Sequence, residues 1–265
     1  MDWKRAHRRI RVVWVTAGVA FLGWLVWSTQ AHGVPDAALK SSRMVRVLEL
    51  DDATLFRPAA PKVGPLVVLL PGGAVDPTAY VPVARAVAEA GWMVALVRLP
   101  WRMAFTDASQ EDVWERVVAA RDAAGVPGPI VLGGHSRGAA LAARFAGEHP
   151  AELAGLFLIG TTHPKADDLS SITMPVLKVS GTRDCVADEN ASLANRSLLP
   201  AGTTWVSIVG ANHAQFAYYG AQLGDCWATI TRDAQQEELL RVVLRWLDTV
   251  SSGRQRQRGA QAAKW

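Results

Sequence analysis

The sequence predicts an α/β protein with a mostly parallel central sheet and helices on both faces. Strand-like and helix-like apolar patterns alternate along residues 44–250, which is typical of strand–helix–strand units with parallel strands. Several apolar runs are continuous, as in GPLVVLL at 64–70, and such runs indicate strands buried on both faces. With 265 residues, 50% of them hydrophobic, the chain can form one large domain of this kind.

Short apolar runs mark the expected strands. A run of four to eight residues bounded by turn-forming residues has the usual length of a buried strand. The runs that meet this description lie at 44–50, 64–70, 92–99, 129–132, 153–159, 176–180 and 203–209.

The segments between these runs have helical patterns. Residues 78–90 carry apolar side chains at helical spacing and stop before Gly91, a residue type that commonly ends helices. Residues 110–124 place Val113 and Val117 on one side. Further helices are expected over the alanine-rich 137–148, over 188–199 and over the amphipathic 232–250. The polar tail 251–265 is expected to be disordered.

The N-terminal segment predicts a membrane anchor. Residues 12–28 (VVWVTAGVAFLGWLVWS) contain no charged side chain and have tryptophans near both ends. At 1.5 Å per residue they span about 25 Å, close to the hydrocarbon thickness of a bilayer. Residues 1–11 carry a net charge of +4, so the positive-inside rule places them in the cytoplasm and the rest of the chain outside. A cleaved signal peptide and a buried core helix are the alternatives.

Residues 29–43 are expected to be a short linker to the main domain at 44–250.

The positive charge lies at the ends of the chain. The segments 1–11 and 251–265 each carry +4, and the whole chain carries +4, so the region between them carries −4. This distribution gives the main domain no basic face and argues against nucleic acid as a partner.

A serine at a strand–helix junction is the candidate nucleophile. Gly134-His135-Ser136-Arg137-Gly138 has the form G-x-S-x-G, and it lies between the end of the strand at 129–132 and the start of the helix at 137–148. A serine there occupies a tight, strained turn that raises its hydroxyl above the carboxyl edge of the sheet. The sequence therefore predicts nucleophilic catalysis by Ser136.

A serine hydroxyl needs a base to become an effective nucleophile. Two of the six histidines, His163 and His213, follow predicted strands. His213 lies in the flexible segment GANH after the last strand, which can place its ring over the sheet edge. His163 precedes the good acid candidates and so breaks the chain order nucleophile–acid–histidine that accompanies this type of turn. His213 is the predicted base.

The third group must be a carboxylate that orients the histidine and stabilises its protonated form. Asp184 comes directly after the strand at 176–180 and is the predicted acid. Asp188 is the nearest alternative, although it is better explained as the N-cap of the following helix. Asp167 and Asp168 remain as weaker alternatives.

An oxyanion hole requires two backbone N–H groups directed at one point. The residue after the nucleophile, Arg137, is predicted to supply one of them. The other is expected from the loop Pro71-Gly72-Gly73-Ala74 after the strand at 64–70, with Gly73 or Ala74 as the donor. A plain turn is the alternative interpretation of this loop.

These motifs together resemble the α/β-hydrolase superfamily over residues 44–250. The stretches LLPGGAVDPTAY, GGHSRGAALAA and GANHAQFAYYG are similar to a bacterial branch without a lid, the dienelactone-hydrolase-like group called α/β-hydrolase fold 5. The resemblance implies an α/β-hydrolase fold without a cap domain, and members of the branch commonly carry an N-terminal anchor. Dienelactone hydrolases use cysteine as nucleophile, so the serine here points instead to ester or thioester cleavage.

The expected function is that of a membrane-anchored, extracytoplasmic carboxylesterase that works through an acyl-enzyme and needs no metal or organic cofactor. The gap 160–175, where caps usually insert in this fold, is too short for a cap domain, so we expect small or short-chain ester substrates. An acyltransferase with the same triad and a non-catalytic binding protein of the same fold are the alternatives.

Cys185 and Cys226 are predicted to form a disulfide beside the site. Cys185 follows the proposed acid, and Cys226 lies in the excursion at 218–231 after His213. If His213 hydrogen-bonds Asp184, these two segments are neighbours. An extracytoplasmic location favours oxidation of the pair.

Overall fold

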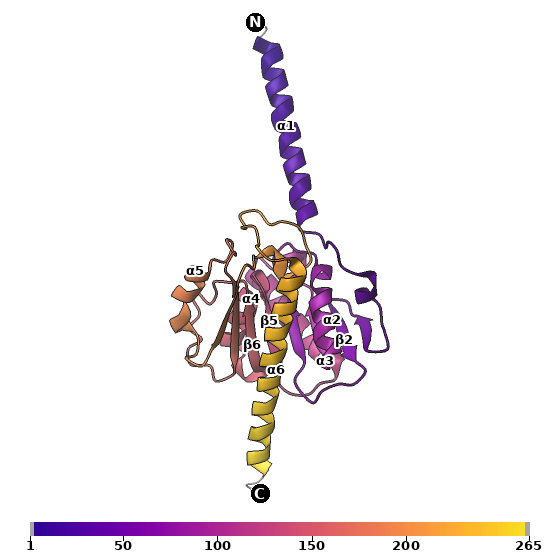
Figure 1. The fold of residues 1–265 in the computed structure, drawn as a ribbon, viewed down its shortest axis with the longest axis vertical. Helices are drawn as coiled ribbons and strands as arrows, with labels where there is room; N and C mark the ends of the chain where they lie inside the picture. The colour runs from indigo at the N-terminus through magenta and orange to yellow at the C-terminus, as the bar shows by residue number, and fades with distance from the viewer. Residues whose placement is uncertain (1–2, 263–265) are drawn as a thin grey trace.

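The computed structural model describes residues 3–262 and contains one mixed sheet (Figure 1). Its eight strands have the order β1-β2-β4-β3-β5-β6-β7-β8. The strands are β1 (Val45–Glu49), β2 (Ala53–Pro58), β3 (Val67–Leu70), β4 (Val94–Val97), β5 (Ile130–His135), β6 (Leu153–Ile159), β7 (Val176–Gly181) and β8 (Thr204–Ile208). β2 is antiparallel to both β1 and β4, and the pairs from β4 to β8 are parallel. The carboxyl ends of β3 to β8 therefore share one edge of the sheet.

Helices cover both faces of this sheet. The helices of the described chain are α1 (Trp3–Ser28), α2 (Val81–Glu89), α3 (Asp107–Ala124), α4 (Arg137–Glu148), α5 (Glu189–Ala194) and α6 (Arg232–Ala262), of which α1 extends away from the sheet and covers neither face (Figure 1). In β3, Val67 and Leu69 pack in a core with α2 and α6, whereas Val68 and Leu70 pack in a second core with α3 and α4. The continuous apolar run in the sequence is explained by this burial on both faces.

α1 extends away from the rest of the molecule (Figure 1). Its segment 7–28 is apolar and long enough to cross a membrane, and none of the most apolar window is buried. The backbone that follows is bound to the domain: the N–H of Gly220 donates to the carbonyl of Ser28 at 2.8 Å, and the N–H of Asp76 donates to that of Thr29 at 2.8 Å. The segment 29–43, expected as a linker, thus begins against the domain surface and includes the short 3-10 helix Asp36–Leu39.

Three elements differ from the sequence-based expectation. β2 was not predicted; it makes an antiparallel hairpin with β1, and its residues are nearly all buried. The helix expected over 188–199 is shorter, because α5 ends at Ala194 and a 3-10 turn follows. α6 continues through Ala262, where a disordered tail from 251 was expected; the glutamines, arginines and alanines of this extension are good helix formers. Residues 263–265 of that tail, and residues 1–2 of the basic N-terminus, lie outside the described part of the chain.

Candidate active site

Ser136 lies in the turn between β5 and α4 with φ 53° and ψ −114°. A positive φ is costly for a residue with a side chain and persists only where the surroundings enforce it. Here the Ser136 N–H donates to the carbonyl of Ile159 on the neighbouring strand at 2.9 Å. A Cβ on Gly134 or Gly138 would come within 2.5 Å of the Leu70 carbonyl oxygen. The two glycines of the motif are thus required by close packing, and the predicted strained turn is present.

His213 and Asp184 form a buried pair at the same sheet edge. His213 Nδ1 lies 2.8 Å from Asp184 Oδ2, and both residues are buried. The other carboxylate oxygen of Asp184 accepts hydrogen bonds from the backbone N–H groups of Val186 and Ala187, at 2.9 and 2.7 Å. These bonds fix the carboxylate so that it orients the imidazole ring.

The second ring nitrogen of His213 is directed at no protein partner. Nε2 is buried and has no hydrogen bond among the described residues. The ring lies beside that of His135, with centroids 4.5 Å apart, and His135 directly precedes Ser136 in the elbow. With Nδ1 held by Asp184, Nε2 is the nitrogen available to a hydroxyl at this edge. The hydrogen bond between a nucleophilic hydroxyl and its base is often long in the free enzyme and tightens only when substrate binds.

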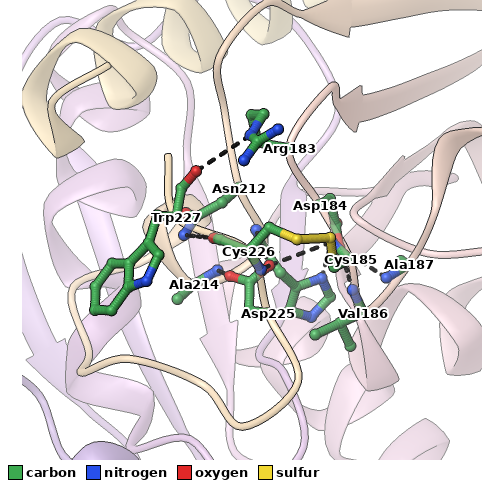
Figure 2. Close-up of a disulfide and its surroundings, with 11 residues drawn as sticks. Arg183, Asp184, Cys185, Val186, Ala187, Asn212, Ala214, Asp225, Cys226 and Trp227 are labelled. Atoms are coloured by element: carbon green, nitrogen blue, oxygen red, sulfur yellow. Dashed lines mark hydrogen bonds and ion pairs between the residues drawn. A yellow bond between two sulfur atoms is a disulfide. The ribbon is translucent and has the colours of Figure 1, made fainter. Parts of the chain in front are cut away.

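Asp225 was not predicted, and it joins the two loops that carry the pair. Its carboxylate accepts hydrogen bonds from the N–H groups of His213 (3.3 Å), Ala214 (2.9 Å), Cys185 (3.3 Å) and Cys226 (2.9 Å). Figure 2 shows it between the histidine loop and the disulfide. Its position next to Cys226 was the only signal in the sequence that could have pointed to it.

The predicted disulfide between Cys185 and Cys226 is present, with a Cα–Cα distance of 5.3 Å. It links the residue after Asp184 to the excursion that follows His213 (Figure 2). The Asn212 side chain, next to His213, donates to the Cys226 carbonyl at 2.8 Å. The excursion is therefore attached to both loops of the pair.

The oxyanion candidates differ in availability. The N–H of Ala74 already donates to the carbonyl of Arg102 at 2.7 Å, which leaves it less available to a substrate oxygen, and its role as a donor stays a prediction. Gly73 lies against Arg137: a Cβ on Gly73 would be 3.2 Å from the Arg137 Cβ. Neither of these two backbone N–H groups donates to another backbone group in the described chain outside regular helices and strands, and both remain candidates.

A second histidine supports the loop of Gly72 and Gly73. The Gly72 N–H donates to Tyr80 Oη at 2.8 Å, and Tyr80 Oη lies 2.7 Å from His135 Nδ1. Tyr80 Oη thus links the Gly72 N–H to the His135 ring. Burial, followed by the charge of nearby His213, holds the pKa of His135 well below its usual range. A neutral ring at this position adds no positive charge next to His213.

The alternative residues have other roles. Asp188 caps α5 by accepting from the Ala191 N–H at 3.0 Å, as its N-cap interpretation predicted. Asp168 accepts from the Ser170 N–H at 2.9 Å in an exposed turn, and Asp167 is also exposed. The carbonyl of His163 accepts from the buried Lys178 ammonium. Among the described residues, no group of three or more His, Cys, Asp or Glu side chains could hold a metal ion.

Comparison with known proteins agrees with this architecture. The profile of the alpha/beta hydrolase family matches residues 66–237. A thermophilic esterase from Thermogutta terrifontis has a TM-score of 0.58 at 16% identity, covering 78% of this chain and 99% of its own. Carboxylesterase CesB from Bacillus subtilis has a TM-score of 0.55 at 14% identity, covering 80% and 93%.

A membrane phospholipase A described as a bacterial virulence factor has a TM-score of 0.54 at 17% identity, and the match covers 93% of this chain and 98% of that protein. At such identities the structural likeness shows the fold. A search of curated protein sequences finds no match. The family profile covers well over half of the sequence, and the chain belongs to the alpha/beta hydrolase family.

Proposed function

We propose that the protein is a membrane-anchored serine carboxylesterase whose catalytic domain lies outside the cytoplasm. The observation that carries this proposal is the strained backbone of Ser136 at the same sheet edge as the buried His213–Asp184 pair. The esterases among the structural neighbours support a reaction on ester substrates.

In the proposed mechanism, Ser136 Oγ attacks the ester carbonyl carbon while His213 Nε2 takes its proton. Asp184 stabilises the resulting imidazolium through the 2.8 Å hydrogen bond to Nδ1. The N–H groups of Gly73 and Arg137 stabilise the negative charge on the carbonyl oxygen. His213 then protonates the departing alcohol, and water releases the acyl group from Ser136 by the same steps in reverse order.

The loop 160–175 supports small or short-chain substrates. It connects β6 to β7 and contains neither a helix nor a strand, so no cap domain covers the site from this connection. A site without a cap gains no apolar surface from such a domain for burying a long acyl chain. The proposed substrates are therefore esters with short acyl groups.

The membrane anchor rests on α1 and on the disulfide. An exposed apolar helix of this length, preceded by cations, favours a single span with the domain outside. A disulfide between Cys185 and Cys226 is typical of an oxidising compartment. Membrane fractionation, followed by protease treatment of spheroplasts, tests this arrangement. We expect the full-length chain in the membrane fraction and digestion of its catalytic domain from outside.

The decisive test of the catalytic proposal is Ser136→Ala. Because the members of a triad act as a unit, we expect hydrolysis of p-nitrophenyl acetate and butyrate to fall roughly 10⁴-fold or more. Labelling by a fluorophosphonate should disappear at the same time. Ser207→Ala, an exposed serine on β8, is the matched control and should keep both properties. Substantial turnover by a folded Ser136→Ala variant would reject the assignment.

A further inference from the structure

The membrane helix joins the domain at the edge that carries the active site. The backbone just after α1 pairs with two loops of that edge: Thr29 with Asp76 in the loop after β3, and His32 with Tyr218 in the segment after His213, at 2.8 and 2.7 Å. Ala31 also forms an isolated bridge with Tyr219. Figure 1 shows α1 leaving from this edge, while α6 runs away from it toward the opposite end of the molecule.

The residues that join α1 to the domain are themselves hydrogen-bonded to the domain, so no flexible linker separates the two. Ser28 is the last residue of α1, and its carbonyl is already bonded to Gly220. Arg102, in the loop after β4, bonds to Gln30 at 3.4 Å and to Asp76 at 3.0 Å. If α1 spans a bilayer, as proposed above, the carboxyl edge of the sheet must therefore lie at the bilayer surface.

The exposed aromatic side chains of the domain gather at this same edge. Among the described residues outside α1, three large aromatic side chains are exposed: Trp101 (91%), Phe105 (72%) and Trp227 (82%). Trp101 and Phe105 are in the loop after β4, and Trp227 is in the excursion after β8. We refer to the three as the rim aromatics. Exposed aromatic side chains, tryptophan above all, are typical of surfaces that contact a membrane interface.

The two loops that carry the rim aromatics are hydrogen-bonded to residues next to the catalytic ones. The guanidinium of Arg137, next to Ser136, donates to the carbonyls of Met103 at 3.0 Å and Ala104 at 2.5 Å, which ties the loop of Trp101 and Phe105 to the elbow. Arg183, next to Asp184, donates to the carbonyl of Trp227 at 3.3 Å (Figure 2).

From these observations we infer that the rim aromatics insert into the surface of the bilayer that holds α1, so that the active site opens onto the membrane interface. The occupant of this surface is lipid, because a membrane-spanning helix enters the domain beside it. The inference rests on the proposed function and deepens it. The substrates it selects are short-chain esters that partition into the interface, in preference to esters that stay in bulk water.

Single spin labels test the contact directly. The described chain has no free cysteine, so a cysteine introduced into the unreduced full-length protein provides one labelling site. Labels at Trp101→Cys, Phe105→Cys and Trp227→Cys are compared, in vesicles of phosphatidylcholine and phosphatidylglycerol, with a label at Val63→Cys. Val63 is equally exposed (78%) but precedes β3 at the opposite edge. Gly18→Cys, which has open space around it, reports on α1 itself.

We expect the rim labels to be accessible to oxygen and protected from a water-soluble nickel chelate, and the Val63→Cys label to be accessible to the chelate. Rim labels that behave like the Val63→Cys label, or that show spin–spin broadening between copies of the chain, would overturn the inference. A Gly18→Cys label accessible to the chelate would show that the anchor itself is wrong. None of these measurements depends on catalysis, so the membrane contact of the rim aromatics can fail or hold independently of the proposed esterase activity.

An activity measurement completes the test. We expect the triple variant Trp101→Ser/Phe105→Ser/Trp227→Ser to lose on the order of tenfold in hydrolysis of a short-chain ester bound to vesicles. Hydrolysis of p-nitrophenyl acetate by the same protein in detergent should be unchanged, because these side chains point into solvent. Equal losses on both substrates, or no loss on either, would contradict the inference.

Discussion

The loops of Asp184 and His213 are joined by a disulfide and by the shared carboxylate of Asp225, whereas the loop of Gly73 is held without any covalent link. On that second side, Tyr80 connects Gly72 to His135, and the Ala74 N–H donates to the Arg102 carbonyl. The comparison shows that two parts of one site are positioned by different means. Asp184 and Gly73 each lie three residues after the end of a buried strand, β7 and β3. The difference lies in the excursion at 218–231 after His213, which the disulfide and Asp225 attach to the loop of Asp184.

Of the substitutions that test the two sides, Asp184→Asn is expected to have the largest effect on kcat. The amide cannot stabilise a protonated His213, and it favours the wrong ring tautomer, so we expect kcat to fall about 10⁴-fold. Steady-state kinetics on p-nitrophenyl butyrate measure the change. Asp188→Asn, at the N-cap of α5, is the control and should keep kcat near that of the wild type. A loss of similar size in the control would show that the assignment of Asp184 as the acid is wrong.

Removing the disulfide tests the cross-link itself. The bridge joins residues 41 positions apart, and the chain-entropy model gives a stabilisation of about 4 kcal/mol for such a loop. We expect Cys185→Ala/Cys226→Ala to lower the free energy of unfolding in urea by up to this amount. Because Asp225 still joins the two loops, the folded variant should keep the proposed esterase activity at 25 °C. An inactive but folded variant would show that the bridge alone positions the pair.

Tyr80→Phe tests the oxyanion side. It leaves the buried Gly72 N–H and His135 Nδ1 without their shared partner, which should cost about 1–3 kcal/mol in the free energy of unfolding. Because Gly73 adjoins Gly72, we also expect kcat to fall more than KM changes. Tyr218→Phe, a partly exposed tyrosine, provides the comparison. A kcat unaffected by Tyr80→Phe would separate this hydrogen-bond chain from catalysis.

The neutral state of His135 predicts a pH dependence of stability. Its folded-state pKa is held well below the ordinary 6.5, so below that pH the unfolded chain binds a proton that the folded protein does not. The free energy of unfolding should then fall as the pH decreases below about 6.5, by up to about 1.4 kcal/mol per pH unit for this one group. His135→Asn should reduce the slope in urea titrations, whereas His149→Asn, at the opposite sheet edge, should keep it.

Much of this arrangement was predictable because its signals are local in sequence. The elbow of Ser136, the position of Asp184 after a strand and the Cys185–Cys226 pairing all followed from short motifs and their order. The occupation of the Ala74 N–H was not predictable, because its partner Arg102 comes from another loop. Asp225 was missed for the same reason: its four hydrogen bonds join segments that only the folded chain brings together.

Secondary structure shows a similar division. The parallel strands were found because their apolar runs are buried on both faces. β2, with Arg57 and Pro58 at its end, lacks such a run and became a strand only through pairing with β1 and β4. The extension of α6 beyond Val250 rests on helix propensity in a segment whose polarity suggested disorder.

The glycines of the elbow also restrict how this enzyme can change. A Cβ at Gly138 would come 2.2 Å from the Leu70 carbonyl oxygen and 2.5 Å from that of Pro71, so the nucleophile turn and the start of the oxyanion loop touch through backbone alone. No side chain separates them, and none can be exchanged to adjust their spacing. Selection for a new substrate therefore has little to act on between Ser136 and Gly73. It must work through the surrounding loops, where side chains are exposed and a substitution leaves the reacting groups in place.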